Sequence, residues 1–304
     1  VGVHVDGASA GSYSGRYLVN YTTPIGLKIE NSDVLLEDVA VSRCVSAGIM
    51  CVNSTVKSTK SLIVWRIYAK PESVEWTLST RGDGIFLQNS NLVFDTSAVA
   101  DSGRHMRYIS AGCEHGIRAV NSLIAGGSRD TTRDISYSKN AAGRDTQTSH
   151  LQVSQCETGF SLKNSVIDYE GRLGSFLNKE GIEAEKSRIS VPLLSINDNQ
   201  NIGIGLNHST LYYGKHSQEI YDLGGFSANS AGAPFFHCDW NGTNISLDNN
   251  ASLDVHPNSD NFSSVGSWGG NTPLSGGDTD VSSNSIMRNF GVVNFVSNVG
   301  APAI

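Results

Sequence analysis

The amino-acid sequence predicts an all-β protein: a right-handed, single-stranded parallel β-helix with coils of about 22 residues, loop insertions and a loop-rich C-terminal region. Three observations support this fold class. A short segment recurs seven times in a fixed register. Within it, apolar and polar positions alternate with the period of two that half-buried strands show. Charged residues make up only 17% of the chain and glycine occurs 32 times, which disfavours long surface helices.

Each copy of the repeat begins at a glycine and has a serine six positions later. The copies occupy residues 26–32, 48–54, 84–90, 116–122, 159–165, 181–187 and 203–209. The positions one, three and eight residues after the glycine carry apolar side chains, which we expect to point inward. Successive glycines are 22, 36, 32, 43, 22 and 22 residues apart. The basic coil is therefore 22 residues long, three consecutive coils carry insertions, and the coil length also underlies the inferred right-handedness.

Asparagine recurs at the fifth position after the glycine, in five of the seven copies. These residues are Asn31, Asn53, Asn89, Asn121 and Asn164. Asparagine tolerates the left-handed backbone that a sharp bend needs. Stacked at ~4.8 Å, such side chains can form hydrogen bonds along the axis of the solenoid. We therefore expect the asparagine and serine columns to be structural and not catalytic.

The repeat weakens at both ends of the chain. Residues 2–5 are similar to a degenerate first copy and residues 291–297 partly return to the motif, whereas residues 223–289 are rich in Gly, Ser and Asn and lack it. We predict a parallel β-helix over 1–222 and a C-terminal region over 223–304 that serves as a cap or a trimerisation element. The chain begins at Val1, without Met, and we expect it to be part of a longer polypeptide.

Composition excludes several classes of partner. A net charge of -7 disfavours nucleic-acid binding, which requires clustered Lys and Arg. The sequence has no apolar run long enough for a membrane span, so membrane insertion is not expected. The cysteines lack metal-site spacing, so we expect free, mostly buried thiols and neither a metal nor a cofactor. They are Cys44, Cys51, Cys113, Cys156 and Cys238.

A coil of about 22 residues with an asparagine ladder resembles the pectate-lyase-like β-helix superfamily, and the glycine-rich C-terminal region resembles the trimeric tailspikes of bacteriophages. The resemblance covers roughly residues 24–215. It implies a homotrimer in the virion tail, hence extracellular, that binds a bacterial surface glycan. The apolar stretch 286–299 is either a trimer contact or a capping strand.

The catalytic signatures of the superfamily do not carry over to this chain. Gly82-Asp83-Gly84 and Glu114-His115-Gly116 are faint echoes of polygalacturonase motifs. The Asp-Asp pair and the Arg-Ile-Lys motif of those enzymes do not occur, and no calcium-binding Asp cluster is recognisable. The resemblance therefore specifies the fold and leaves the activity open.

The three insertions are expected to lie side by side on one flank, where aromatic, Arg and Asp side chains can bind sugars. The candidate glycan-binding residues are Trp65, Arg66, Trp76, Arg107, Tyr108, His115 and Tyr137. Two interpretations of Trp65 remain open. It is either a core residue of a local strand over 61–68 or a binding residue.

Candidate catalytic residues come from the positions just before the repeat glycine. The register stacks Glu114 near Glu157, with Asp83 and His115 alongside. Glycosidases use two carboxyl groups, and one member of a close pair has a raised pKa and acts as general acid. Glu114, Glu157 and Asp83 are the predicted catalytic residues. The alternative is a solvated turn in which Lys179 compensates the charge of Glu157.

Three functional classes follow. The first is a tailspike that cleaves bacterial polysaccharide as a glycoside hydrolase or polysaccharide lyase. The second is a tail adhesin or structural virion protein without catalytic activity. The third is a secreted polysaccharide hydrolase or lyase of a cellular organism.

Overall fold

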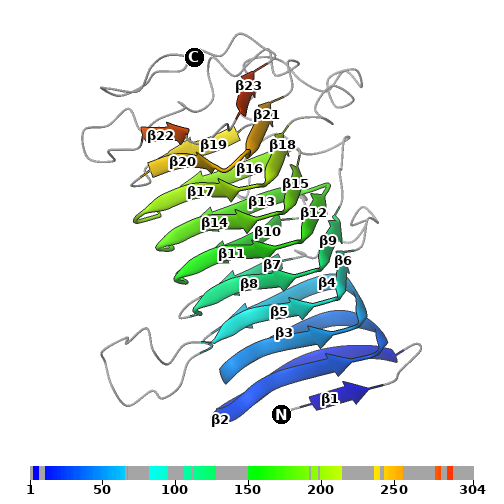
Figure 1. The fold of residues 1–304 in the computed structure, drawn as a ribbon. Helices are drawn as coiled ribbons and strands as arrows, with labels where there is room; N and C mark the ends of the chain where they lie inside the picture. The colour runs from blue at the N-terminus through cyan, green and yellow to red at the C-terminus, as the bar shows by residue number, and fades with distance from the viewer. Residues whose placement is uncertain are drawn as a thin grey trace, which may run out of the picture.

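The computed structural model describes a solenoid of stacked β-strands (Figure 1). It describes residues 3–6, 11–65, 67, 82–94, 106–110, 113–127, 150–191, 193–197, 199–213, 236–239, 243–255, 278–281 and 286–289. Every strand pairing in these ranges is parallel. This part of the chain contains no helix that could cross a membrane. The prediction of an all-β parallel solenoid is confirmed.

Each coil contributes one strand to each of three sheets, so a strand pairs with the third strand after it. The first sheet contains β1 (Val3–Asp6), β5 (Asp83–Gln88), β8 (His115–Val120), β11 (Thr158–Lys163), β14 (Glu180–Glu185), β17 (Ile202–Asn207), β20 (Thr243–Asp248) and β22 (Asp278–Val281). The second contains β6 (Asn91–Phe94), β9 (Leu123–Gly126), β12 (Val166–Tyr169), β15 (Arg188–Val191), β18 (Thr210–Tyr213), β21 (Ser252–Val255) and β23 (Ile286–Asn289). The third contains β7 (Met106–Ser110), β10 (His150–Ser154), β13 (Arg172–Phe176), β16 (Leu193–Asn197) and β19 (Phe236–Asp239).

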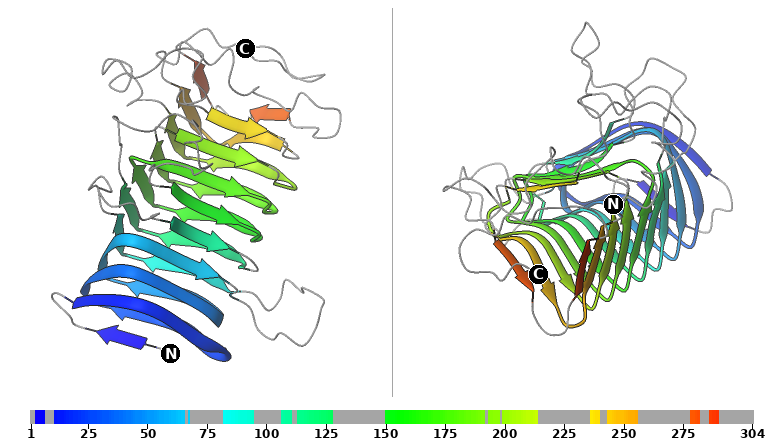
Figure 2. Two further views of the ribbon diagram at one scale, coloured as in Figure 1. Left: turned by 180° about the vertical axis from the view of Figure 1, so that it is seen from behind. Right: turned by 90° about the horizontal axis from the view of Figure 1, so that it is seen from above.

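The first coils have longer strands that turn the corners between sheets. They are β2 (Gly11–Glu30), β3 (Asp33–Val52) and β4 (Thr55–Trp65). The middle of β3 pairs with the end of β4, for example Val41 with Val64, whereas the end of β3 pairs with β5. Seen along the axis, the stacked strands enclose the interior of the solenoid (Figure 2).

The predicted inward positions form continuous apolar columns along the axis. Ile182 of β14 pairs with Phe160 of β11 and with Ile204 of β17. All three side chains are fully buried. The other two predicted columns are also buried from coil to coil. They run through Ile29, Cys51, Leu87, Ala119, Leu162, Ala184 and Leu206, and through Val34, Val56, Leu92, Ile124, Ile167, Ile189 and Leu211.

The solenoid continues beyond residue 222, where the sequence places its end. Strands β19, β20 and β21 pair in register with β16, β17 and β18, and β22 and β23 pair with β20 and β21. Ile245 and Leu247 of β20 are buried and extend two of the apolar columns. This eighth copy has Asn244 where the others have glycine, which hides it from a search anchored on that glycine.

At Gly116 and Gly181 the contact between neighbouring coils leaves no room for a side chain. A Cβ atom at Gly116 would lie 2.0 Å from Cγ1 of Val153 and 2.8 Å from the carbonyl oxygen of Gly159. At Gly181 it would lie 2.3 Å from the carbonyl oxygen of Gly203. A larger residue would therefore force the coils apart at this corner.

Two ladders run along one corner of the solenoid, as predicted. The amide of Ser54 donates to Oγ of Ser90 at 3.1 Å, and the same bond recurs from Ser32 to Ser209. The asparagines beside these serines have φ between 47° and 50°. Nδ2 of Asn89 donates to Oδ1 of Asn53 at 3.2 Å. Both ladders link each coil to the next at this bend, and their roles are structural.

The insertions do not all leave the solenoid at one corner, so that expectation is wrong. The first connects β4 to β5, from the third sheet to the first. The second and third connect β6 to β7 and β9 to β10, from the second sheet to the third. The residues inside the insertions lie outside the described ranges.

Four cysteines are free and buried, as expected for Cys44, Cys51, Cys113 and Cys156. Cys156 belongs to a further ladder, separate from the two described above, because its amide donates to Oδ1 of Asn178 at 2.8 Å. The amide of Asn178 donates in turn to Oδ1 of Asn199 at 3.1 Å. The side chain of Cys238 lies outside the described set.

Candidate functional site

Two of the predicted site residues meet at the start of the first sheet. Asp83 of β5 and His115 of β8 occupy equivalent positions in adjacent coils, and Nδ1 of His115 lies 2.8 Å from Oδ1 of Asp83. An ionised carboxylate can only accept, so Nδ1 carries the proton in this bond. Nη1 of Arg118 lies 3.9 Å from the other carboxylate oxygen of Asp83. Asp83 therefore joins His115 to Arg118.

The other two predicted catalytic residues have a different environment. The turns stack as expected, because the amide of Thr158 donates to the carbonyl oxygen of Glu114 at 2.8 Å. Oε2 of Glu157 lies 3.6 Å from Nζ of Lys179, whereas Glu114 is solvent-exposed. The geometry matches the charge-compensated turn that the sequence left as an alternative.

Apart from His115 in the first sheet, the predicted sugar-binding residues divide between the third sheet and segments outside the described residues. Trp65 ends β4, is half-buried and pairs with Ser42 and Ser110 in the third sheet. Arg107 and Tyr108 lie in β7 of that sheet, and their side chains are outside the described set. Arg66, Trp76 and Tyr137 lie outside the described residues altogether.

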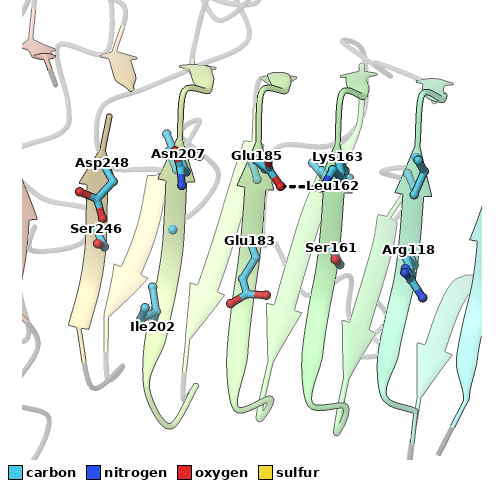
Figure 3. A pocket seen from close by; sticks show the side chains of 15 residues that line it. Arg118, Ser161, Leu162, Lys163, Glu183, Glu185, Ile202, Asn207, Ser246 and Asp248 are labelled. Atoms are coloured by element: carbon cyan, nitrogen blue, oxygen red, sulfur yellow. Dashed lines mark ion pairs between the residues drawn. The ribbon is translucent and has the colours of Figure 1, made fainter. Parts of the chain in front are cut away.

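A groove of about 340 Å³ lies on the outer face of the first sheet. It crosses β8, β11, β14, β17 and β20, and Figure 3 shows the side chains that line it. The polar and charged ones come from two outward positions of the repeat, two and four residues after the glycine, and Ile202 contributes from the position just before it. The polar and charged members are Arg118, Ser161, Lys163, Glu183, Glu185, Asn207, Ser246 and Asp248.

The register places these side chains in rows that run along the groove. In one row Arg118 pairs with Ser161, and Ser161 pairs with Glu183. Because parallel strands are ~4.8 Å apart, a guanidinium and a carboxylate lie two strands apart with a hydroxyl between them. In the adjacent row, Nζ of Lys163 lies 3.2 Å from Oε2 of Glu185. The guanidinium of Arg118 also lies over the ring of Phe86, 5.4 Å from its centroid.

Strand β14 is the most acidic part of the face, with Glu180, Glu183 and Glu185 along its outer side. Burial raises the pKa of Glu180 above its ordinary value, and the charge of Glu183 raises it further. Hydrogen bonds to Glu180 oppose this shift: Nδ2 of Asn201 donates at 2.7 Å and the amide of Ile202 at 3.1 Å. A carboxyl with a raised pKa thus lies on the strand that crosses the middle of the groove.

The described side chains contain no cluster of His, Cys, Asp and Glu suited to a metal ion. The groove offers several hydrogen-bond donors and acceptors. These are the amide of Asn207, the hydroxyls of Ser161 and Ser246, and the charged side chains of the two rows.

The sequence prediction does not include the groove residues, because the outward positions of the repeat change from copy to copy. The sequence does contain the signal. The repeat register that stacks Asp83 on His115 also stacks Arg118, Ser161 and Glu183 at the position two residues after the glycine. In the sequence alone, the polar residues of such a row look the same as those of any solvent-exposed face, so polarity does not reveal the groove.

Comparison with known proteins adds no relative to this description. No family model matches the chain, and neither the curated proteins nor the solved structures give a match.

Proposed function

We propose that this chain binds an extended polysaccharide in the groove on the first sheet. The observation that carries the proposal is the groove itself, which crosses five strands and is lined by cationic, hydroxyl, carboxylate and amide side chains. Five strands at ~4.8 Å span about 19 Å, enough for several consecutive sugar residues. Sugars offer hydroxyl groups to such donors and acceptors and apolar ring faces to the spaces between them.

Other classes of ligand fit the groove less well. Peptides that bind to sheets add a strand at an edge, whereas β11, β14 and β17 each have a paired strand on both sides. Nucleic acid requires clustered cations, and the groove has two basic and three acidic residues. A groove that crosses five strands and carries charged, hydroxyl and amide side chains favours a linear chain with hydroxyl groups over a compact apolar ligand.

In its biological setting, we propose a receptor-binding protein of the bacteriophage tailspike type that recognises bacterial surface polysaccharide. The support is the resemblance of the coil and its asparagine ladder to those proteins, together with the groove. A homotrimer located in the virion tail belongs to the same proposal. So does right-handedness of the solenoid, supported by the strong preference of parallel crossover connections for that hand.

A second candidate is hydrolysis of the bound polysaccharide. Glu180 favours it, because a carboxyl with a raised pKa can protonate the oxygen of the breaking glycosidic bond. Glu183, on the same strand, provides a second carboxylate to activate a water molecule or attack the sugar. The reaction adds one water across the bond. A protein that binds the polysaccharide and does not hydrolyse it is an adhesin.

The test is retention of glycans on the purified protein, followed by mass analysis of the products. The probe is a panel of neutral, amino-sugar-containing and uronate-containing bacterial surface polysaccharides. We expect at least one to be retained, with binding at least tenfold weaker in Arg118→Ala and Glu183→Gln. Asp168→Asn, which removes an exposed carboxylate from the second sheet, serves as the control and should bind normally.

The outcomes separate the candidates. Shortened products that have gained one water, and that disappear in Glu180→Gln, would establish hydrolysis, whereas products with an unsaturated end would indicate a lyase. Retention without shortening would identify an adhesin. Failure to retain any polysaccharide, or equal binding by the groove variants and the wild type, would overturn the proposal.

A further inference from the structure

Gly205 is the one residue of its row without a side chain in the strands that cross the groove. The position two residues after the repeat glycine points outward. It holds Phe86 in β5, Arg118 in β8, Ser161 in β11, Glu183 in β14 and Ser246 in β20. In β17 it holds Gly205, which is paired with Glu183 on one side and Ser246 on the other. The row is therefore interrupted in the groove.

The fold does not require a glycine at this position. A Cβ atom at Gly205 would lie 3.6 Å from both the carbonyl oxygen of Ile182 and Cγ2 of Ile202, which is ordinary van der Waals contact. The described glycines with positive φ are Gly126 and Gly127, so Gly205 has a backbone that any residue can adopt. Glycine within a strand destabilises the fold relative to alanine, because its backbone loses more conformational freedom on folding.

The missing side chain leaves a notch with chemically distinct walls. Glu183 and Ser246 flank it along the row, and Ile202 and Asn207 flank it along β17. All four line the groove, and Figure 3 shows them around this part of the strand. One wall is apolar and three are polar, so the notch combines a flat apolar surface with hydrogen-bonding groups.

We propose that Gly205 forms the floor of a subsite that holds one sugar ring of the polysaccharide against the backbone of β17. This inference rests on the proposed function and names the feature that sets the fit of the ligand. Glycine within a strand marks a place where a ligand approaches the backbone closely. The ring places its C–H face on Ile202 and Gly205, and its hydroxyls donate to Glu183 and exchange hydrogen bonds with Ser246. Asn207 donates from Nδ2, because its Oδ1 already accepts from Nδ2 of Asn249 at 3.1 Å.

The charges around the notch select the class of sugar. Glu183 has the hydroxyl of Thr158 as a neighbour at 3.5 Å. Of the two groove cations, Lys163 is paired with Glu185. The other, Arg118, lies two strands from Glu183 and beside Asp83. A carboxylate on the ligand would be repelled here, and hydroxyl or ammonium groups would be attracted. The subsite therefore takes a neutral sugar or an amino sugar with a free amine, and it excludes a uronic acid.

Filling the notch tests this subsite without disturbing the core. The variants are Gly205→Ala and Gly205→Val, with Ala125→Val as the control that adds bulk to the outer face of the second sheet. Thermal unfolding of both Gly205 variants should occur at or above the wild-type temperature, because the strand loses its glycine. Binding to the polysaccharides retained from the panel should fall at least tenfold in Gly205→Val and less in Gly205→Ala.

Normal binding by Gly205→Val, or selective retention of uronate-only polysaccharides by the wild type, would overturn the subsite. If Arg118→Ala and Glu183→Gln still weaken binding in that case, the proposed function survives without it. If the panel shows no binding at all, the proposed function fails first. Should Gly205→Val unfold, Gly205→Ala decides: a stable protein with unchanged affinity would count against the inference.

Discussion

The stability of the fold depends on the protonation of the Glu180 carboxyl, at the start of β14. Its pKa is raised in the folded protein, chiefly by burial, so the folded state holds this proton at a pH where the unfolded state has released it. The unfolded state gains relative stability as the pH rises above 4.5, the ordinary value, until the raised pKa is passed. Below 4.5 the carboxyl is protonated in both states and has no such effect.

Glu180→Gln should therefore gain stability relative to the wild type as the pH rises from about 4 to about 7, through and above the ordinary pKa of 4.5. Chemical denaturation at several pH values measures the difference. Glutamine keeps one acceptor, so a constant offset is expected, and the informative quantity is its change with pH. The same series on Asp168→Asn controls for loss of a carboxylate. A difference that does not change with pH would contradict this account.

At the scale of the element, two coils lack asparagine at the fifth position after the repeat glycine, where the asparagine ladder runs. Lys186 and His208 have φ of 49° at positions where most copies have asparagine. The left-handed region costs about 1–2 kcal/mol for residues other than glycine, and least for asparagine and aspartate. These two residues also interrupt the side-chain bonds that join Asn31, Asn53 and Asn89.

Lys186→Asn should stabilise the protein by about 0.5–1 kcal/mol, because asparagine relieves the backbone and extends the ladder toward Asn164. Urea unfolding measures the change. Lys57→Asn makes the same chemical substitution at an exposed strand position of β4 and should bring no gain. Equal effects in the two variants would show that loss of a charge, and not the left-handed backbone, is responsible.

The elements differ in how much the sequence can predict of them. Inward columns such as Phe160, Ile182 and Ile204 are predictable, because a position that must be apolar in every coil leaves a signal in each copy. The row of Arg118, Ser161 and Glu183 is not predictable in this way. Any polar residue is tolerated at a solvent-exposed position, so the residue type changes from coil to coil and leaves no repeated signal. The pairing of Asp83 with His115 could be predicted only because two adjacent copies happened to be polar there.

At the scale of the molecule, the described residues share one continuous core, and the thiols within it report on its integrity. Burial raises the pKa of Cys44 and Cys51 to about 12, and hydrogen bonding to Cys156 together with burial raises that of Cys113. Thiolates are the reactive form, so these groups are inert at neutral pH while the coils are stacked.

A thiol-specific alkylating reagent should therefore leave Cys44, Cys51, Cys113 and Cys156 unmodified in the native protein at pH 7.5, a pH ~1 unit below the usual thiol pKa. Mass analysis of the peptides locates the modification, and the same reaction in denaturant should label all four. Labelling of Cys51 in protein that remains folded by circular dichroism would show that the coils open locally.

The length of a coil has a consequence for how such a binding surface can change over time. Residues 159–180 and 181–202 are consecutive units of 22 residues. Each unit supplies one residue to every inward column and one to every outward row. Duplicating or deleting one unit would keep every apolar column in register while moving the groove by one step of ~4.8 Å. If the groove binds polysaccharide as proposed, the length of ligand that it holds depends on the number of coils, and a single tandem duplication could alter that length without a new fold.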